Sequence, residues 1–157
     1  EKSSLVVGNG RPFFAKMINP KRRKKVVRGK TNLEGIQLLE LRKINELPKG
    51  QILFKSKVEI IVETDDQIND RMLNNLELLD MPLQIHVDGK KSSPKNIYKI
   101  RSKKISSKLL KVNIHADGGI PIKSFIQSSY VVPNFTDLLK SECKCVQFDF
   151  KKIDVMS

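Results

Sequence analysis

The segment Gln51–Glu63 constrains the fold of this 157-residue chain more than any other stretch. Its apolar positions are filled mostly by residues that favour extended backbone, namely Ile52, Phe54, Val58, Ile60, Ile61 and Val62. We therefore predict one long β-strand here. The remaining segments have to supply the strands that pair with it and the helices that cover it.

Alternating apolar residues and turn signals predict further strands on both sides of this segment. These strands are Leu5–Val7, Phe13–Ile18, Met81–Val87, Ile97–Ile105, Leu109–His115 and Cys143–Asp154. Helical spacing predicts helices at Gly35–Glu46, at Gln67–Leu79 after the N-cap signal Thr64-Asp65-Asp66, at Ile122–Ser128 and at Pro133–Leu139. This order predicts a single α+β domain over residues 1–157 with a largely antiparallel sheet.

The charge balance points to a polyanionic partner. The chain carries 30 Lys and Arg against 17 Asp and Glu, which gives a formal net charge of +13. Such an excess favours RNA, DNA or an anionic membrane surface. No apolar run approaches the roughly 20 residues that span a bilayer, and no N-terminal signal sequence is visible. We therefore expect a cytoplasmic protein with no membrane partner.

A glycine-rich turn near the N-terminus is the first candidate site. In Gly8-Asn9-Gly10-Arg11-Pro12, the glycines and the asparagine allow a tight turn, and Pro12 stiffens the backbone from which Arg11 projects. The basic segment that follows contains Lys21, Arg22, Arg23, Lys24 and Lys25. This combination is suited to hold a phosphate backbone. An ordinary hairpin corner with a solvated basic flank fits the same residues.

A second candidate site lies at Asp117-Gly118-Gly119, where a strand is expected to lead sharply into a helix. Backbone N–H groups near a helix start attract anions, and Lys123 is expected in the first turn beside them. The alternative is that Lys123 is a solvated surface lysine.

The histidines and cysteines form no recognisable catalytic or metal-binding pattern. His86 and His115 are far apart in sequence, and each lies in a predicted strand. Cys143 and Cys145 offer two thiols without the second pair of ligands that a zinc site needs. We interpret the cysteines as reduced thiols and predict no metal site.

Three segments occur in an order that is typical of one enzyme family. The first is Gly8-Asn9-Gly10-Arg11-Pro12-Phe13 with Asn19-Pro20 after it, and the second is Ile44-Asn45. The third is Gly119–Ile126, with Pro133-Asn134 downstream. Together they resemble the catalytic domain of the archaeal and eukaryotic tRNA pseudouridine-54/55 synthases (the Pus-Ten type), and the resemblance covers essentially the whole chain.

The resemblance implies the pseudouridine synthase fold, a mixed and mainly antiparallel sheet flanked by helices, with an RNA cleft across it. It implies isomerisation of uridine to pseudouridine in the T-loop of tRNA, at position 54 or 55, without cofactor or metal. A carboxylate would be the nucleophile that attacks a uridine flipped out of its stack. An N-terminal RNA-binding domain would precede the catalytic domain.

The resemblance also assigns individual residues. Glu1 falls in the slot of the family's catalytic Asp, so either Glu1 replaces this Asp or the Asp lies upstream of the given sequence. Lys57 occupies the slot of a Tyr that packs on the base. Pro121 occupies the slot of a second Tyr, whereas Lys123 matches the family. Arg11 and the basic segment would hold tRNA phosphates.

Two other functions stay open at this stage. Because Glu1, Lys57 and Pro121 depart from the family pattern, a catalytically inactive relative that acts as an RNA-binding or ribosome-associated module is the alternative. A basic DNA-binding domain would be expected to show a helix-turn-helix or zinc pattern, and the sequence contains neither.

Overall fold

The computed structural model describes residues 13–21, 31–39, 41–47, 49–50, 52–88, 93–127 and 130–156. Within these ranges, a small hairpin is formed by β1 (Thr31–Leu33) and β2 (Ile36–Leu38). A larger sheet contains β3 (Phe54–Thr64), β4 (Leu83–Val87), β5 (Lys95–Lys104), β6 (Leu109–Asp117), β7 (Val131–Val132) and β8 (Cys143–Val155). The helices are α1 (Asp70–Glu77), α2 (Ile122–Gln127) and α3 (Phe135–Leu139).

The larger sheet has the strand order β7-β4-β5-β6-β3-β8, and every pair of neighbours is antiparallel. The interior strand β3, next to the edge strand β8, is the one predicted from Gln51–Glu63, and it pairs with β6 on its other side. The α+β class with an antiparallel sheet is therefore confirmed. The parallel pairing implied by a mixed sheet is not found among the described strands.

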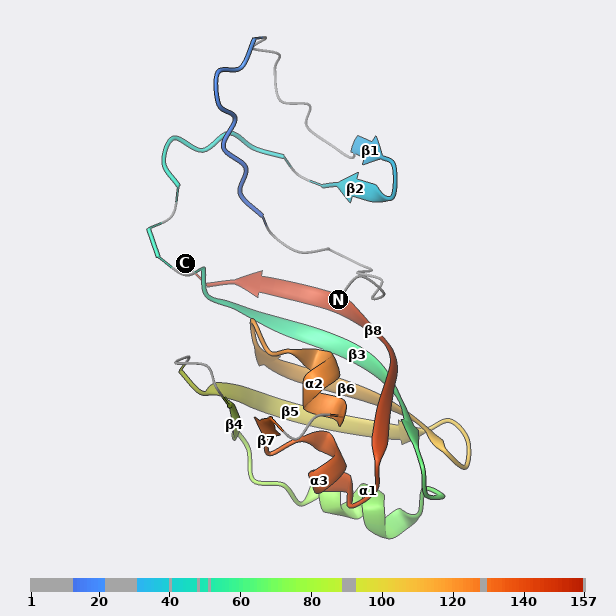
Figure 1. Cartoon of the computed structure of the whole chain (residues 1–157). Helices are drawn as coiled ribbons and strands as arrows, with labels where there is room; N and C mark the ends of the chain where they lie inside the picture. Colours follow the sequence, from blue (N-terminus) through green and yellow to red (C-terminus); the bar gives the residue numbers. More distant parts are fainter. Residues whose placement is uncertain are drawn as a thin grey trace.

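The core lies between one face of this sheet and the three helices. Along β3 the even-numbered residues from Ser56 to Thr64 are buried, as expected for a strand with one covered face. Val58 and Ile60 belong to the same apolar cluster as Phe125 of α2 and Phe135 of α3, whose rings lie 6.1 Å apart in an edge-to-face arrangement. Figure 1 shows α2 and α3 in front of the sheet and α1 at its lower end. The odd-numbered side chains of β3 point to the other face.

A register shift in β8 changes which of its apolar residues are buried. The sequence predicts that Val146, Phe148 and Phe150 alternate toward the core. Phe148 and Phe150 are buried, but Val146 is 52% exposed. Between Ile61 and Val62 of β3 the register shifts, and Val146 becomes the extra residue of a bulge. A bulge interrupts the two-residue alternation, so the prediction was wrong for Val146.

The elements predicted for the described residues upstream of β3 are wrong. Gly35–Glu46 is not a helix, because Gly35, with φ +70°, forms a hairpin turn and β2 follows it. Ile44 and Leu47 of the expected apolar stripe are exposed, and short helices are stable only when such a stripe is packed. Phe13–Ile18 is not a strand, since it pairs with no described segment. The predicted strand Leu5–Val7 lies outside the described residues.

The downstream helices are confirmed, with one correction to a cap. α1 begins at Asp70, and its N-cap is Asn69, whose side chain accepts a hydrogen bond from the Met72 N–H at 3.0 Å. The predicted cap segment Thr64-Asp65-Asp66 precedes this position: Thr64 ends β3, and its hydroxyl donates to the Asp66 carbonyl at 2.8 Å. None of the helices in the described ranges is long and apolar enough to cross a membrane.

Candidate nucleic-acid interface

We call the sheet face that α1, α2 and α3 leave uncovered the open face. It carries the odd-numbered side chains of β3 and β6, together with the residues that the register places beside them on β5 and β8. Its charged residues are Lys55, Lys57, Glu59, Glu63, Lys99, Arg101, Lys103, Lys111, Asp117, Lys144, Asp149, Lys151, Lys152 and Asp154. Cations outnumber carboxylates in this set, which makes the open face a basic surface.

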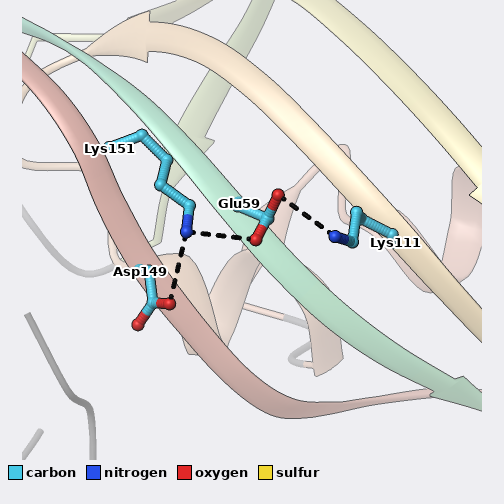
Figure 2. A network of polar contacts seen from close by, with 4 residues as sticks. All are labelled: Glu59, Lys111, Asp149 and Lys151. Carbon is cyan, nitrogen blue, oxygen red and sulfur yellow. Dashed lines mark ion pairs between the residues drawn. The ribbon is translucent and has the colours of Figure 1, made fainter. Parts of the chain in front are cut away.

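A network of ion pairs crosses the middle of the open face. The Glu59 carboxylate of β3 lies 3.4 Å from Lys111 Nζ of β6 and 3.2 Å from Lys151 Nζ of β8, and Lys151 Nζ also lies 3.6 Å from the Asp149 carboxylate. Figure 2 shows these contacts as dashed lines. Glu59 and Asp149 are direct cross-strand partners. A second register shift between β3 and β8 lies between Lys57 and Val58, and Lys151 is its extra residue. This bulge allows Lys151 to lie on the same face as Asp149 and Lys152.

These ion pairs set the charge state of Glu59. Burial on its own would raise the pKa of Glu59, but the hydrogen bonds and charges of Lys151 and Lys111 outweigh this effect and lower the pKa below its ordinary value. The hydrogen bond to Glu59 in turn raises the pKa of Lys151. Lys111 and Lys151 are therefore largely neutralised by carboxylates of the same face.

A second polar cluster surrounds Tyr98 of β5, close to the first residues of β3. The Tyr98 hydroxyl donates to Asp117 Oδ1 at 2.8 Å, and the Asn96 N–H donates to Asp117 Oδ2 at 2.8 Å. Lys55 Nζ lies 4.0 Å from the centre of the Tyr98 ring. The centres of the Tyr98 and His115 rings are 5.5 Å apart, and the ring planes make an angle of 45°. Aromatic rings on a basic surface are a common feature of proteins that bind unpaired bases.

Other cations of the open face have no carboxylate within 4.0 Å in the part of the chain that the structure describes. They include Lys57 on β3 and Lys99, Arg101 and Lys103 on β5, all of which are exposed. The three β5 residues occupy alternate positions, which are about 7 Å apart along an antiparallel strand. These cations are the ones that the open face can offer to a polyanion.

Three predicted site residues lie near the described strands, and they divide between the two faces of the sheet. Lys57 is exposed on the open face, where it pairs in register with His115. Pro121 is half-buried before α2, and its carbonyl accepts a hydrogen bond from the Phe125 N–H at 2.8 Å. Lys123 is exposed on α2, which packs on the opposite face. Lys57 and Lys123 therefore project from opposite faces of the sheet.

The remaining predicted site residues are mostly beyond the described ranges. Lys21 is exposed at the end of the described segment 13–21. Glu1, Arg11 and the rest of the basic segment lie outside the described residues, so their roles stay predictions.

The sharp connection predicted at Asp117-Gly118-Gly119 is confirmed. The Gly118 N–H donates to the Phe54 carbonyl at 2.6 Å, and the Phe54 ring lies so close that a Cβ on residue 118 would overlap it. Gly119 has φ +85°, in the left-handed region that favours glycine. The two glycines thus allow β6 to turn directly into α2.

Sequence reasoning missed the Tyr98 cluster. The pattern correctly predicts a strand around Tyr98, but nothing in it shows that Asp117 holds the tyrosine hydroxyl, because Asp117 has the features of a turn residue. His115 is isolated from other histidines in the sequence, so it gave no signal of a cluster. The usable signal was a tyrosine beside alternating cations, at Tyr98, Lys99 and Arg101.

The cysteines are free thiols. Cys143 is buried and its Sγ donates to the Ser141 carbonyl at 3.2 Å. Burial raises the pKa of Cys143 to about 11, so its thiol is almost entirely protonated at neutral pH. Within the described ranges, no three His, Cys, Asp or Glu side chains lie close enough together to hold a metal ion.

Comparison with known proteins gives one consistent result. A protein named tRNA pseudouridine synthase Pus10 from Nitrosopumilus maritimus (strain SCM1) is 35% identical over 157 residues, which cover 99% of this chain and 41% of that relative. The protein of the same name from Cenarchaeum symbiosum (strain A) is 32% identical over 155 residues, with 99% and 39% covered. The one from Methanocaldococcus jannaschii is 25% identical over 171 residues, with 94% and 37% covered.

The chain thus spans about two fifths of the length of these curated relatives. The family described as "Pus10, C-terminal" matches residues 3–154, which is nearly the whole chain. This match shows that the chain belongs to the Pus10 C-terminal family.

Proposed function

We propose that this chain is the catalytic part of a tRNA pseudouridine synthase, which converts uridine to pseudouridine at position 54 or 55 of the T-loop. The observation that carries the proposal is the family match over residues 3–154, with relatives named tRNA pseudouridine synthase. The antiparallel sheet with helices on one face would then be the pseudouridine synthase fold.

The reaction is an isomerisation, which explains why no redox partner is required. The bond between ribose C1′ and uracil N1 breaks, and a bond between C1′ and C5 forms. C5 loses a proton and N1 gains one, so the substrate and the product contain the same atoms. The protein has to supply a carboxylate that attacks the uridine and a site that retains the detached base while it turns. The target nucleotide must also leave its stack.

The roles of individual residues follow from the family resemblance and are part of the proposal. The carboxylate is assigned to Glu1, in the slot of the catalytic Asp. The residues that the resemblance assigns to the uridine and its phosphate are Arg11, Lys57, Pro121 and Lys123. Because Lys57 and Lys123 project from opposite faces of the sheet, one nucleotide on the open face would contact Lys57 and not Lys123. The basic segment Lys21–Lys25 is assigned to the tRNA backbone. The exposed cations of the open face support this assignment, because tRNA is a polyanion and affinity for it depends strongly on Lys and Arg.

Tritium release tests the proposed activity directly. The full protein is incubated with tRNA that carries tritium at C5 of its uridines, and tritium that appears in water is measured. We expect release of one tritium per modified position, and its loss when uridines 54 and 55 are both replaced by cytidine. Single replacements show which position is the target. No release from tRNA with both uridines present would contradict the enzyme proposal.

The second candidate function is a module that binds RNA without catalysis. It is favoured by Glu1, Lys57 and Pro121, which differ from the residues that the family resemblance expects at these slots. It predicts salt-sensitive tRNA binding without tritium release, and binding that Glu1→Ala leaves unchanged. The enzyme proposal predicts instead that Glu1→Ala abolishes release.

A further inference from the structure

Four side chains form a row that crosses the open face at right angles to the strands. The register places Lys152 of β8 opposite Lys57 of β3, Lys57 opposite His115 of β6, and His115 opposite Lys99 of β5. We call these four residues the cross-strand row. Neighbouring strands are about 4.8 Å apart, so the row extends about 14 Å across the sheet.

The cross-strand row brings like charges together without neutralising all of them. Like charges directly opposite each other destabilise a sheet, and Lys57 faces Lys152. Lys152 has a carboxylate partner, Asp154, at 2.7 Å. Lys57 and Lys99 have none within 4.0 Å in the described part of the chain.

The next row along the sheet is built differently. There the carboxylates of Glu59 and Asp149 face each other, and Lys151 and Lys111 provide the opposite charge. The open face thus neutralises its acidic row and leaves its basic row with uncompensated positive charge. An anionic ligand is the missing partner that this arrangement fits.

The aromatic rings beside the cross-strand row specify the kind of anion. His115 belongs to the row, and its ring lies 5.5 Å from that of Tyr98, whose hydroxyl is fixed by Asp117. Tyr98 lies at the register shift between Ile97 and Lys99, and this shift places Lys99 opposite His115. Cations that alternate with aromatic rings suit unpaired RNA, whose phosphates and splayed bases are bound together. A fully paired duplex keeps its bases stacked and could use the cations alone.

We propose that the cross-strand row binds the phosphodiester backbone of an unpaired RNA segment, and that the Tyr98–His115 pair contacts a base of the same segment. In this arrangement Lys57 is a phosphate ligand. The inference rests on the proposed function for the source of the RNA, which is the loop of a tRNA arm. The row itself is defined by the register and the charges of the sheet.

The salt dependence of RNA binding tests the row. The full chain is titrated with a T-arm stem–loop RNA at several salt concentrations, and Lys57→Gln/Lys99→Gln is compared with the wild type. Removing one cation that binds a single-strand phosphate reduces the slope of log K against log salt by about 0.7, so we expect a reduction of about 1.4 for the pair. Arg71→Gln/Lys108→Gln is the matched control, because it removes two exposed cations that lie outside the open face. This control variant should reduce the slope by less than half of the reduction expected for Lys57→Gln/Lys99→Gln.

A stability measurement separates a binding role from a structural one. Because the row places like charges together, Lys57→Gln/Lys99→Gln should have an unchanged or higher Tm while it binds RNA more weakly. Lys57→Arg/Lys99→Arg keeps both charges and should retain the wild-type slope, which provides a test even if the glutamine variant is poorly folded. An unchanged slope in the glutamine variant, an equal fall in the control, or a reduced slope in the arginine variant would overturn the proposal.

The same preparations distinguish this inference from the proposed enzyme activity. If wild-type protein releases no tritium but the slope falls as expected, the row stands and the enzyme proposal fails. If tritium is released but the slope does not change, the enzyme proposal stands and the row is refuted.

Discussion

Glu59 and Asp149 lie directly opposite each other on β3 and β8, and the ammonium group of Lys151 contacts both carboxylates. Two facing carboxylates would repel each other without a cation between them. The bulge that places Lys151 on this face therefore has a definite electrostatic role. The same arrangement makes the stability of the sheet depend on pH.

Glu59→Gln should lower stability at pH 7 by about 0.2 to 1 kcal/mol, the range measured for solvent-exposed ion pairs. The folded-state pKa of Glu59 is lowered, so its contribution is present above its unfolded value of 4.5 and is lost as the pH falls through the folded pKa. The difference in Tm between wild type and variant should therefore be largest near pH 7 and should vanish at low pH. Thermal unfolding monitored by circular dichroism measures it. Glu63→Gln, on the same strand, is the control, and a pH-independent difference for Glu59→Gln would contradict the expectation.

Gly118→Ala should destabilise the chain, because the added Cβ would overlap the Phe54 ring. Overpacking of this kind typically costs about 1 to 3 kcal/mol. The Phe54→Ala substitution removes the ring and with it the clash. The loss of stability in Gly118→Ala/Phe54→Ala should therefore be clearly smaller than the sum of the losses in the two single variants. Urea unfolding of all four proteins gives the coupling energy. Strictly additive costs would show that the ring and residue 118 do not interact.

Asn69→Ala should lower stability by about 1 kcal/mol, the typical effect of removing an N-cap side chain. In a domain of this size the loss corresponds to a fall in Tm of about 2 to 4 °C. Asn69→Ser should retain most of the stability, since serine also caps helices well. Asp65→Ala tests the predicted cap segment Thr64-Asp65-Asp66, and a fall in Tm for Asp65→Ala but not for Asn69→Ala would place the cap in that segment.

Cys143 should resist alkylation in the folded protein. With a pKa of about 11, the thiolate at pH 8 is roughly 100-fold or more scarcer than in an unperturbed cysteine, and burial adds a steric barrier. In the Cys145→Ser variant, iodoacetamide labelling followed by mass spectrometry should show slow modification that becomes fast in denaturant. The raised pKa also means that the buried thiol contributes fully to stability below its unfolded pKa and loses this contribution as the pH rises toward 11. Equal labelling rates in the folded and unfolded states would contradict the expected burial.

The strands of the large sheet were predictable because one covered face imposes a two-residue alternation, which is clear in β3, β6 and most of β8. The residues upstream of β3 were not predictable in this way. Ile44 and Leu47 have helical spacing, but they are exposed, so the pattern does not report packing. Spacing indicates a helix only where another element buries the apolar stripe.

The candidate site was predictable only in part, because the sequence shows which face a strand residue points to but not which residues lie beside it on neighbouring strands. The alternation along β3 was enough to predict that Lys57 points away from the core. That Lys57 lies between Lys152 and His115 depends on the register, and the register depends on bulges that leave no clear mark in the sequence. Tyr98 lies at such a shift as well.

The bulge at Lys151 also affects how this surface could change during evolution. Lys151 and Lys152 are consecutive, yet both lie on the open face, because Lys151 is the extra residue between the pairs Val58–Phe150 and Lys57–Lys152. Deletion of the single codon for Lys151 would therefore restore simple alternation and leave every later side chain of β8 on its present face. The same deletion would remove the cation that lies between Glu59 and Asp149. Homologues that lack this residue should therefore keep the charge pattern of the strand end and replace one of the two facing carboxylates.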